Sequence, residues 1–438
     1  MAIAKRQVAE LSASLESASP SERQDTLDEM IAIGELAIPY LIVHLESTDY
    51  RLRGAAAEAL GNIAGEEAIP NLIELLADSS VNAQRSAAEA LTKVGEAAID
   101  DLLEALMSKD QGARRWAAEA LGSIGDASVA HSLITRLGDA NTEVQRAAIT
   151  ALGELKSKEA LEPLISILSS EHVELARAAA EALGKIRSQV AIKPLLNALG
   201  SPSDDVREAA AQALINIGKR TLPSLVKKLV DPDHRVRAQA AVILGEVGDQ
   251  RVVASLVCAL GDESETVVCK AAVSLGRLAG DGAIPQLSRL ARSRQATVRC
   301  AVATGLSWAR GAKAVAPLSR LLADPDWATR MTAARALGLV GRPTAAKALA
   351  AAFADREWCV RMHAACALGK IGDRKTGLPT LQRALQDKND HVRKAAVEAL
   401  AQLRAAEAKA WLRPLLHDDS SVVAEAAATA MKALDAIK

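Results

Sequence analysis

Residues 192–214 read IKPLLNALGSPSDDVREAAAQAL, a pattern that recurs along most of the chain. A short apolar run with a proline near its start is followed by a polar turn and an alanine-rich run. The apolar residues of both runs recur every three or four positions, as on one face of an α-helix. Proline is tolerated at the start of a helix, where its missing N–H would have no partner within the helix anyway. The stretch therefore predicts two helices joined by a tight polar turn.

The same unit recurs at a nearly constant interval. Proline opens the first helix of many units, as at Pro39, Pro70 and Pro285. We expect the regularly spaced glycines to end helices rather than to form flexible linkers. If the glycine of the Ala-Leu-Gly motif, or the residue in its place, is taken as a marker, the step is 30 to 32 residues throughout, at Gly61, Thr92, Gly122, Gly153, Gly184, Ile215, Gly245, Gly276, Ser307, Gly338, Gly369, Ala401 and Lys432.

The composition agrees with a helical repeat protein. Half of the 438 residues are hydrophobic, yet there are only one Phe, two Tyr and five Trp. Alanine, leucine and valine must therefore form the core, and such small side chains suit closely packed helices. Because no single helix pair could bury its apolar face alone, neighbouring pairs must stack. We predict an all-α solenoid of about 13–14 helix pairs, each of about 31 residues.

Charged residues also recur at fixed register. Aspartate or serine stands fourteen residues before each marker, and arginine stands at the start of many second helices. This periodicity favours a structural ladder that joins neighbouring units over a general acid or base. The aspartates are Asp78, Asp139, Asp231, Asp262, Asp324, Asp355, Asp387 and Asp418, and the arginines are Arg53, Arg114, Arg207, Arg237, Arg299, Arg330, Arg361 and Arg393.

Residues 192–214 and the stretch LPTLQRALQDKNDHVRKAAVEAL at 378–400 resemble the short HEAT-type repeat of the phycobilisome-lyase-like class. The resemblance implies a curved stack of helix pairs whose second helices line the concave side. We expect residues 1–37 to form a degenerate N-terminal capping repeat, residues 38–405 twelve HEAT-like repeats, and residues 406–438 a C-terminal capping repeat. Relatives of this class include bilin lyases, so a bilin or tetrapyrrole lyase-like or chromophore-binding function is one alternative, although no catalytic motif of those enzymes is matched.

Motifs of catalytic and metal sites are missing from the sequence. It contains no Gly-rich phosphate loop, no His-Glu metalloprotease motif and no paired Cys-x-x-Cys spacing. Cys359, His363 and Cys366 lie at helical spacing, but a metal site would have to be built almost wholly from one helix. His44 falls in a first helix without an evident partner. We therefore predict a non-enzymatic protein with no catalytic residue, no metal and no cofactor.

A second alternative is binding of a nucleic-acid backbone. The net charge of −1 provides no general basic field. Arginines do recur on the second helices of the N-terminal half, but glutamates at neighbouring positions offset them, so nucleic acid is an unlikely partner. These arginines are Arg85, Arg114, Arg115, Arg146 and Arg177, and the glutamates are Glu89, Glu119 and Glu181.

The sequence also indicates the compartment. The first residues lack the apolar stretch of a secretory signal, and no run approaches the length of a membrane span. All five cysteines lie between Cys258 and Cys366, and their odd number fits reduced thiols better than a disulfide framework. We expect a cytoplasmic protein that does not insert into a membrane.

The most unusual side chains share one face of the second helices near the C-terminal end. The position seven residues before the marker carries sulfur in four successive units, at Cys269, Cys300, Met331 and Met362. Trp327 precedes one of these methionines by one turn. Trp358 precedes the other, while Arg335, His363 and Cys366 lie beside them or one turn later. Other units carry polar or smaller residues where these tryptophans stand, namely Gln111, Thr142, Asp204 and Glu265, with Tyr50 near the N-terminal end.

Two interpretations of this face are open. Cysteine and methionine are often buried, so the row could pack between repeats. Alternatively, it forms a binding surface, which the two tryptophans favour because a core position would not tolerate polar residues in other units. We predict a protein–protein interaction scaffold whose partner presents an apolar helix or extended segment to the concave face. The predicted partner-binding residues are Trp327, Met331, Arg335, Trp358, Met362, His363, Cys366, Cys300 and Cys269. Neither the identity of the partner nor the oligomeric state follows from the sequence.

Overall fold

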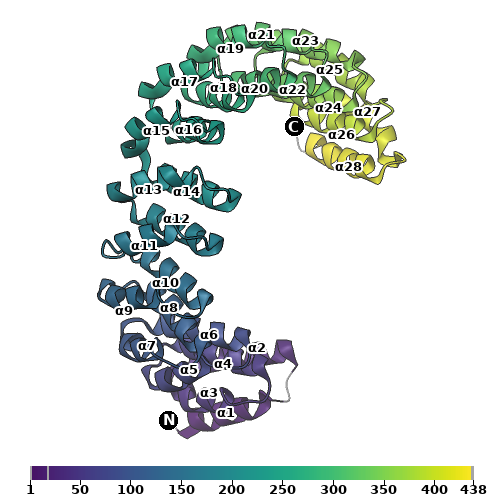
Figure 1. Ribbon diagram of the computed structural model, residues 1–438. Coiled ribbons are helices and arrows are strands. Elements are labelled where there is room, and N and C mark those ends of the chain that lie inside the picture. The colour runs from purple at the N-terminus through teal and green to yellow at the C-terminus, as the bar shows by residue number, and fades with distance from the viewer. Residues whose placement is uncertain (1, 17–18, 436–438) are drawn as a thin grey trace. The chain divides into compact units, whose positions relative to one another are not determined.

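The computed structural model describes residues 2–16 and 19–435 of the chain. They form two compact units, which we call unit 1 (Met1–Thr221) and unit 2 (Leu222–Lys438). The described residues form α-helices and short 3-10 helices and no β-strand (Figure 1). The predicted all-α solenoid of helix pairs is thus confirmed. The capping repeats expected at residues 1–37 and 406–438 stay a prediction.

In unit 1, first helices alternate with second helices, and from α3 onward a tight turn joins the two helices of a repeat. The first helices are α1 (Ala2–Ser14), α3 (Ile38–His44), α5 (Ile69–Leu75), α7 (Ile99–Ala105), α9 (Ala130–Arg136), α11 (Leu161–Leu168) and α13 (Ile192–Ala198). The second helices are α2 (Pro20–Ile33), α4 (Tyr50–Ile63), α6 (Val81–Val94), α8 (Gln111–Ile124), α10 (Thr142–Glu154), α12 (Val173–Ile186) and α14 (Asp204–Ile217). Short 3-10 turns lead into the next repeat at η1 (Gly34–Ala37), η2 (Glu66–Ala68), η3 (Gly95–Ala98), η4 (Ala127–Val129), η5 (Gln189–Ala191) and η6 (Gly218–Thr221).

Unit 2 has the same plan. Its first helices are α15 (Leu222–Lys228), α17 (Val253–Ala259), α19 (Ile284–Leu290), α21 (Val315–Leu321), α23 (Ala346–Ala351), α25 (Arg374–Ala384) and α27 (Ala408–Leu412). Its second helices are α16 (His234–Val247), α18 (Glu265–Ala279), α20 (Ala296–Leu306), α22 (Trp327–Val340), α24 (Trp358–Ile371), α26 (Asp390–Gln402) and α28 (Ser421–Asp435). Its 3-10 turns are η7 (Gln250–Val252), η8 (Gly280–Ala283), η9 (Ala312–Ala314), η10 (Pro343–Ala345), η11 (Ala352–Ala354) and η12 (Arg413–His417).

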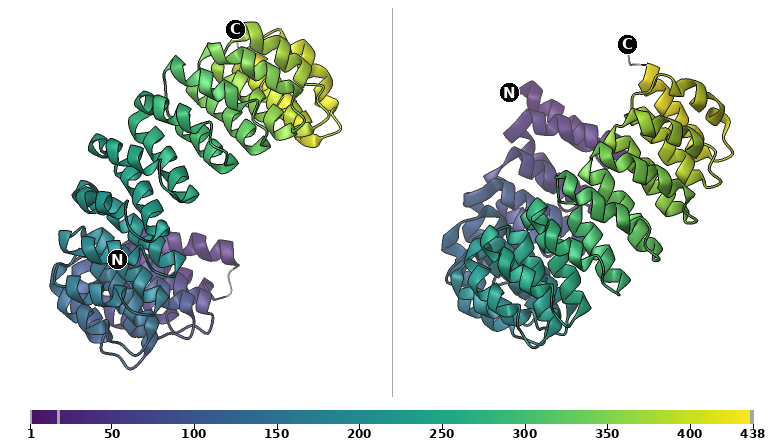
Figure 2. Two further views of the ribbon diagram at one scale, coloured as in Figure 1. Left: turned by 45° about the horizontal axis from the view of Figure 1, so that its top comes forward. Right: turned by 90° about the horizontal axis from the view of Figure 1, so that it is seen from above.

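The helices of each unit are arranged in two layers. Successive second helices pack side by side, as α4 does on α6 and α22 on α24, and each first helix packs on the second helix of its own repeat. Within unit 2 the second helices lie on the inner side of the bend and the first helices on the outer side (Figures 1 and 2). We call the layer of second helices the inner layer.

Leucine and alanine fill the space between the layers, as the composition predicts. The leucine just before the marker is fully buried in every unit from Leu60 to Leu400. A leucine of the first helix is also fully buried in every unit from Leu41 to Leu412. Because these side chains come from both layers, the core of each unit runs continuously from one of its repeats to the next.

The marker glycines lie inside the second helices, so the prediction that they end helices is wrong for them. A Cβ atom on Gly122, in α8, would lie 2.6 Å from the Cα atom of Ala151 in α10. Real Cβ atoms do not approach another atom so closely, and glycine is therefore what allows the two helices to pack at this distance. Other glycines do end helices, as Gly125 does with a φ of 88°.

The predicted ladder of arginines and aspartates is confirmed. The Nε and Nη2 atoms of Arg114 donate to the Asp139 carboxylate at 2.8 and 2.9 Å, and Nη1 donates to backbone carbonyls of the preceding turn. These bonds lower the pKa of Asp139. Arg207 and Asp231 are exceptions, since Arg207 pairs with Asp204 of its own helix and Asp231 pairs with Lys228. The same bidentate pair joins Arg53 to Asp78, Arg237 to Asp262, Arg299 to Asp324, Arg330 to Asp355, Arg361 to Asp387 and Arg393 to Asp418.

The N-terminal helix α1 packs against α3 of the first regular repeat. The ring Nε2 atom of His44, in α3, lies 2.8 Å from the Oγ atom of Ser12 in α1. His44 is buried, and this burial lowers its pKa. The expectation that His44 lacks a partner is therefore wrong, because Ser12 lies outside the repeating pattern that the sequence makes visible.

Candidate functional site

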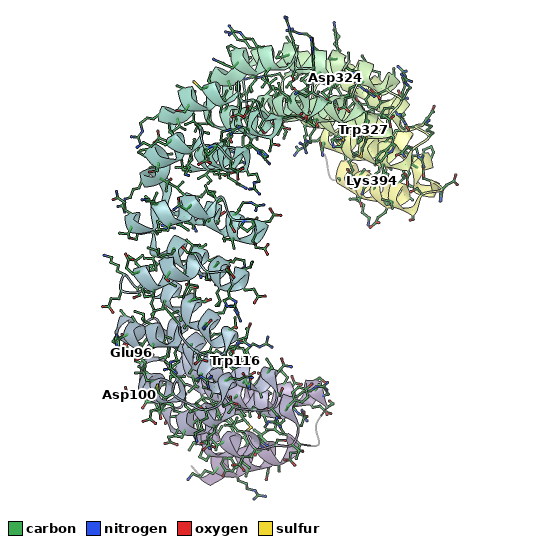
Figure 3. All side chains as sticks on the ribbon, in the orientation of Figure 1. Glu96, Asp100, Trp116, Asp324, Trp327 and Lys394 are labelled. Atoms are coloured by element: carbon green, nitrogen blue, oxygen red, sulfur yellow. The ribbon has the colours of Figure 1, made fainter. Side chains whose placement is uncertain are left out.

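The two tryptophans of the predicted row lie at the surface of unit 2. Trp327 and Trp358 are the first residues of α22 and α24, and they are 49% and 40% exposed. Met331 and Met362 follow one turn later on the same helices and are half-buried. Figure 3 labels Trp327 on the inner layer. Because α22 and α24 pack side by side, the four side chains form one patch across two adjacent repeats.

Different contacts fix the start of α22 and the ring of Trp358. Asp326 caps α22, and its carboxylate accepts a hydrogen bond at 2.8 Å from the Thr329 amide, so the helix begins at Trp327. The indole of Trp358 stacks on the ring of His391 in α26, with 5.2 Å between centroids and 27° between planes. This contact leaves the Trp358 ring partly exposed in a fixed orientation.

The cysteines of the row are less accessible than the tryptophans. Cys269 and Cys300 are half-buried, and the Cys300 Sγ atom lies 3.2 Å from the hydroxyl of Thr332 in α22. Burial raises the pKa of Cys269, and the thiol is neutral at physiological pH. The Cys300 sulfur atom thus lies between the adjacent helices α20 and α22, whereas Trp327 and Trp358 are more exposed.

The other predicted residues surround Met331 and Met362. Arg335 is exposed, while His363 and Cys366 are half-buried. The Nδ1 atom of His363 lies 2.9 Å from the carbonyl oxygen of Cys359 in the same helix. Burial raises the pKa of Cys366. Within residues 2–16 and 19–435, no three His, Cys, Asp or Glu side chains are placed to hold a metal ion.

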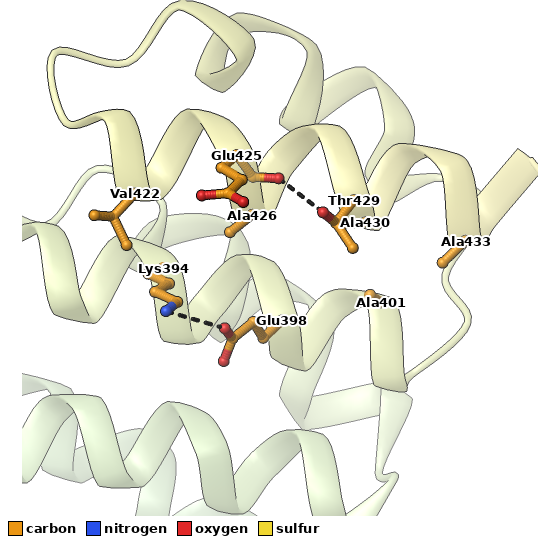
Figure 4. A pocket seen from close by; sticks show the side chains of 9 residues that line it. All are labelled: Lys394, Glu398, Ala401, Val422, Glu425, Ala426, Thr429, Ala430 and Ala433. Atoms are coloured by element: carbon orange, nitrogen blue, oxygen red, sulfur yellow. Dashed lines mark hydrogen bonds and ion pairs between the residues drawn. The ribbon is translucent and has the colours of Figure 1, made fainter. Parts of the chain in front are cut away.

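The apolar row ends at α26, where a charged pair replaces it. Lys394 takes the position of Met362 and lies 3.7 Å from Glu398. These two residues and Val422, Glu425 and Thr429 line a shallow depression of about 370 Å³ between α26 and α28 (Figure 4). The mixture of charged and small side chains distinguishes this depression from the neighbouring patch of tryptophan and methionine.

The same helix face in unit 1 carries ion pairs. Arg115 lies 3.2 Å from Glu119, and Arg177 lies 2.6 Å from Glu181. Further pairs join Arg146 to Glu143 at 2.7 Å and Arg85 to Glu89 at 4.0 Å, while Arg114 belongs to the ladder. The N-terminal arginines therefore face carboxylates rather than forming a free cationic surface for phosphates.

A second exposed apolar pair in unit 2 was not predicted from the sequence. Trp308 is 47% exposed and Leu339 is 56% exposed, and both directly follow the marker. A signal was present in the sequence, because this position is polar in the other units from the first to the twelfth marker, at Asn62, Lys93, Ser123, Glu154, Lys185, Asn216, Glu246, Arg277, Lys370 and Gln402.

Comparison with protein families identifies the repeat. The family model for HEAT repeats matches residues 8–92, 69–140, 130–215, 222–307, 284–364 and 351–432. The chain belongs to the HEAT-repeat family. These matches concern HEAT repeats in general, so the phycobilisome-lyase-like subclass stays a prediction. No curated protein sequence is similar enough to count as a relative.

Solved HEAT-type structures confirm the fold. Yeast importin-β (Kap95p) superposes with a TM-score of 0.58 at 15% identity, covering 98% of this chain and 70% of its own. Kap95 in its complex with Nup1 gives 0.62 at 16% identity over 98% and 70%. Kap95p bound to RanGDP gives 0.60 at 16% identity over 96% and 69%. At such identities the similarity concerns the fold alone. Among the helices of residues 2–16 and 19–435, none is both long and apolar enough to span a membrane.

Proposed function

We propose that this HEAT-repeat protein is a non-enzymatic scaffold that binds another protein through the inner layer of unit 2. The observation that carries the proposal is the exposed pair Trp327 and Trp358 on adjacent helices. The contact surface includes Met331 and Met362 and is bordered by Arg335, His363, Cys366, Cys300 and Cys269.

The tryptophan pair provides the binding energy in this proposal. Large aromatic side chains bury 150–250 Å² each and dominate many interfaces, roughly in proportion to the area that they lose to water. Here 49% of Trp327 and 40% of Trp358 are exposed to solvent. A tryptophan at the centre of an interface commonly contributes about 2 kcal/mol or more, which is roughly thirtyfold in affinity.

The chemistry of the patch defines its partner. An apolar helix or extended segment would cover both indoles, and the flexible thioethers of Met331 and Met362 can adapt to its shape. Arg335 is exposed beside them and forms no ion pair with any residue that the structure describes. It would therefore favour a segment with an acidic residue next to its apolar face.

The structural neighbours support a protein partner of this kind. Two of the importin-β structures are complexes, one with Ran and the other with Nup1. These partners belong to importin-β, and the proposal takes from them only that a solenoid of this fold can hold proteins.

A double substitution tests the proposal. Proteins enriched from a lysate of the source cell by the tagged chain are compared with those enriched by Trp327→Ala/Trp358→Ala, and the partner lost is then titrated in purified form. We expect capture to be abolished and the thermal transition to move little, because both side chains lie outside the core. The control is Arg115→Ala/Glu119→Ala, which removes an ion pair from the same face of unit 1.

Unfolding of the tryptophan variant would show that the row stabilises the fold instead. Unchanged folding together with unchanged affinity would place the binding site elsewhere.

A further inference from the structure

Trp308 and Leu339 line a hollow at the edge of unit 2 where second helices end. Its volume is about 510 Å³, and Arg310, Val340 and Arg342 contribute to its wall. Trp308 lies just beyond the end of α20, and Leu339 lies in the last turn of α22. We call this site the edge hollow. It is distinct from the patch of Trp327 and Trp358, which lies where second helices begin.

Trp308 and Leu339 occupy a position at which side chains of other repeats make polar contacts with one another. At the same position of other repeats, Lys93 donates to Asn62 at 2.7 Å and Lys185 pairs with Glu154 at 2.5 Å. Each contact crosses from one repeat to the next. The fold thus accepts polar residues at this position, so packing does not require the change to tryptophan and leucine in two successive repeats.

The backbone of the edge hollow is held in place. The carboxylate of Asp281 accepts hydrogen bonds from the amides of Arg310 and Gly311 at 2.8 and 2.7 Å. The Arg342 guanidinium donates to the carbonyl of Arg310 through two nitrogens, one of them at 2.9 Å. These bonds tie three successive repeats together, so the hollow is formed before a ligand binds.

The rim of the hollow is cationic. Arg310 and Arg342 are exposed, and two further exposed cations follow them, Lys313 in η9 and Lys347 at the start of α23. The Arg310 side chain forms no ion pair with any described residue, although Asp281 lies against its backbone. Three corresponding turns of unit 1 are acidic instead, with Glu66 and Glu67 in η2, Glu96 in η3 and Asp126 before η4, whereas η6 carries Lys219 and Arg220. Figure 3 labels Glu96 together with Asp100. Cations at this turn are thus not a requirement of the fold.

We infer that the edge hollow binds an acidic, extended segment of a partner protein that carries one large apolar side chain. The apolar side chain would pack between Trp308 and Leu339. Its flanking carboxylates would pair with the exposed guanidinium of Arg310 and with the Nη1 atom of Arg342, which is not bonded to the Arg310 carbonyl. Arginine suits this role because its planar guanidinium can bind a carboxylate through two hydrogen bonds. This second site goes beyond the proposed inner-layer site and does not depend on it.

A nucleic acid is the less suitable ligand for this hollow. The guanidinium of Arg277 lies 5.2 Å from the centre of the Trp308 ring, so that face of the indole is not free to stack on a base. The neighbouring apolar surface is the aliphatic Leu339, which packs against a side chain but offers no stacking plane. An aliphatic or aromatic residue of a peptide fits this arrangement better.

A synthetic peptide tests the inference directly. The probe is a fluorescein-labelled peptide with one leucine flanked on both sides by glutamates, titrated with the full-length protein and followed by fluorescence anisotropy. The variant Trp308→Asn/Leu339→Gln introduces residue types that this chain already carries at the same position, at Asn62 and Gln402. It should therefore fold normally. We expect it to bind at least about tenfold more weakly, and Arg310→Glu to weaken binding about threefold to tenfold.

Three controls test whether the peptide binds at the edge hollow and whether both its leucine and its glutamates contribute to binding. A peptide with serine in place of leucine should lose about tenfold in affinity, and raised salt should weaken binding of the original peptide. The variant Trp327→Ala/Trp358→Ala should bind the probe as the unmodified protein does, whatever becomes of the inner-layer site. Equal binding by Trp308→Asn/Leu339→Gln would overturn the inference. So would a labelled oligothymidylate that binds more tightly than the peptide and is lost in the same variant.

Discussion

Replacing Gly122 with alanine tests how closely the second helices pack. The new Cβ atom would lie 2.6 Å from both the Cα and the Cβ atoms of Ala151. Both contacts involve atoms fixed to the backbone, so α8 and α10 must move apart. Forcing a methyl group into a packed core costs roughly 1–3 kcal/mol, and a backbone contact belongs at the upper end. Alanine regains about 1 kcal/mol of helix propensity over glycine. The net loss is therefore about 2 kcal/mol.

The assay must report on the repeat itself, because each repeat contacts only its neighbours and unfolding need not be all-or-none. Amide hydrogen exchange of the full chain, followed by mass spectrometry, gives this resolution. A loss of about 2 kcal/mol corresponds to roughly thirtyfold faster opening. We expect this faster exchange of amide hydrogens in α8 and α10 and not in α22 or α24.

The matched control is Gly138→Ala, in the turn after α9. A Cβ atom there would have the Thr135 carbonyl oxygen as its nearest neighbour, at 3.9 Å. This variant should be neutral or slightly more stable. If Gly122→Ala is as stable as the control, the close contact does not limit the packing, and the marker glycines are not what sets the distance between second helices.

Three further predictions concern the ladder and the thiols. Asp355→Ala leaves the largely buried Arg330 without its carboxylate and should cost about 2–3 kcal/mol in urea unfolding, whereas an unchanged midpoint would show that the ladder adds nothing. The pKa of Asp139 is lowered in the folded state by Arg114, so the stability that this pair contributes is present above about pH 4 and is lost as the pH falls further. Asp139→Asn should reduce the loss of stability in acid, and a pH profile of stability identical to that of the unmodified protein would contradict this prediction. Cys258 is the exposed cysteine and should react first with a thiol reagent; a half-buried cysteine that reacts sooner would refute this order.

The architecture could be predicted from the sequence because the repeat is dictated by short-range physics. Leucine and alanine at helical spacing, proline near helix starts and a constant step of about 31 residues all indicate stacked helix pairs. The ladder of arginine–aspartate pairs could also be predicted, because equivalents of Arg114 and Asp139 recur at a fixed register. The role of Gly122 could not be read in this way. A glycine inside a helix and a glycine at its end look alike in sequence, and only the distance between neighbouring helices distinguishes them.

The candidate site was predictable where a residue departs from the pattern at the surface. Trp327 and Trp358 stand out against polar residues at the same register, and both are exposed. The sulfur atoms were harder to interpret, since Cys300 faces Thr332 of the next helix, and this contact depends on how adjacent helices meet. The stacking of Trp358 on His391 depends in the same way on the separation of two repeats, which the sequence does not encode locally.

Comparison of the repeats with one another provides a criterion for function in a solenoid. Each repeat meets the same neighbours in the same geometry, so the fold imposes similar demands on equivalent positions. A change of chemistry at one register is therefore either a local packing solution or a functional feature, and solvent exposure separates the two. Cys300 meets the first description because it touches the next helix. Trp308 and Leu339 meet the second, since they remain exposed where other repeats use polar contacts. By the same criterion, an exposed apolar pair beside exposed arginines favours a ligand with both an apolar and an acidic part, which is the chemistry that the peptide titration examines.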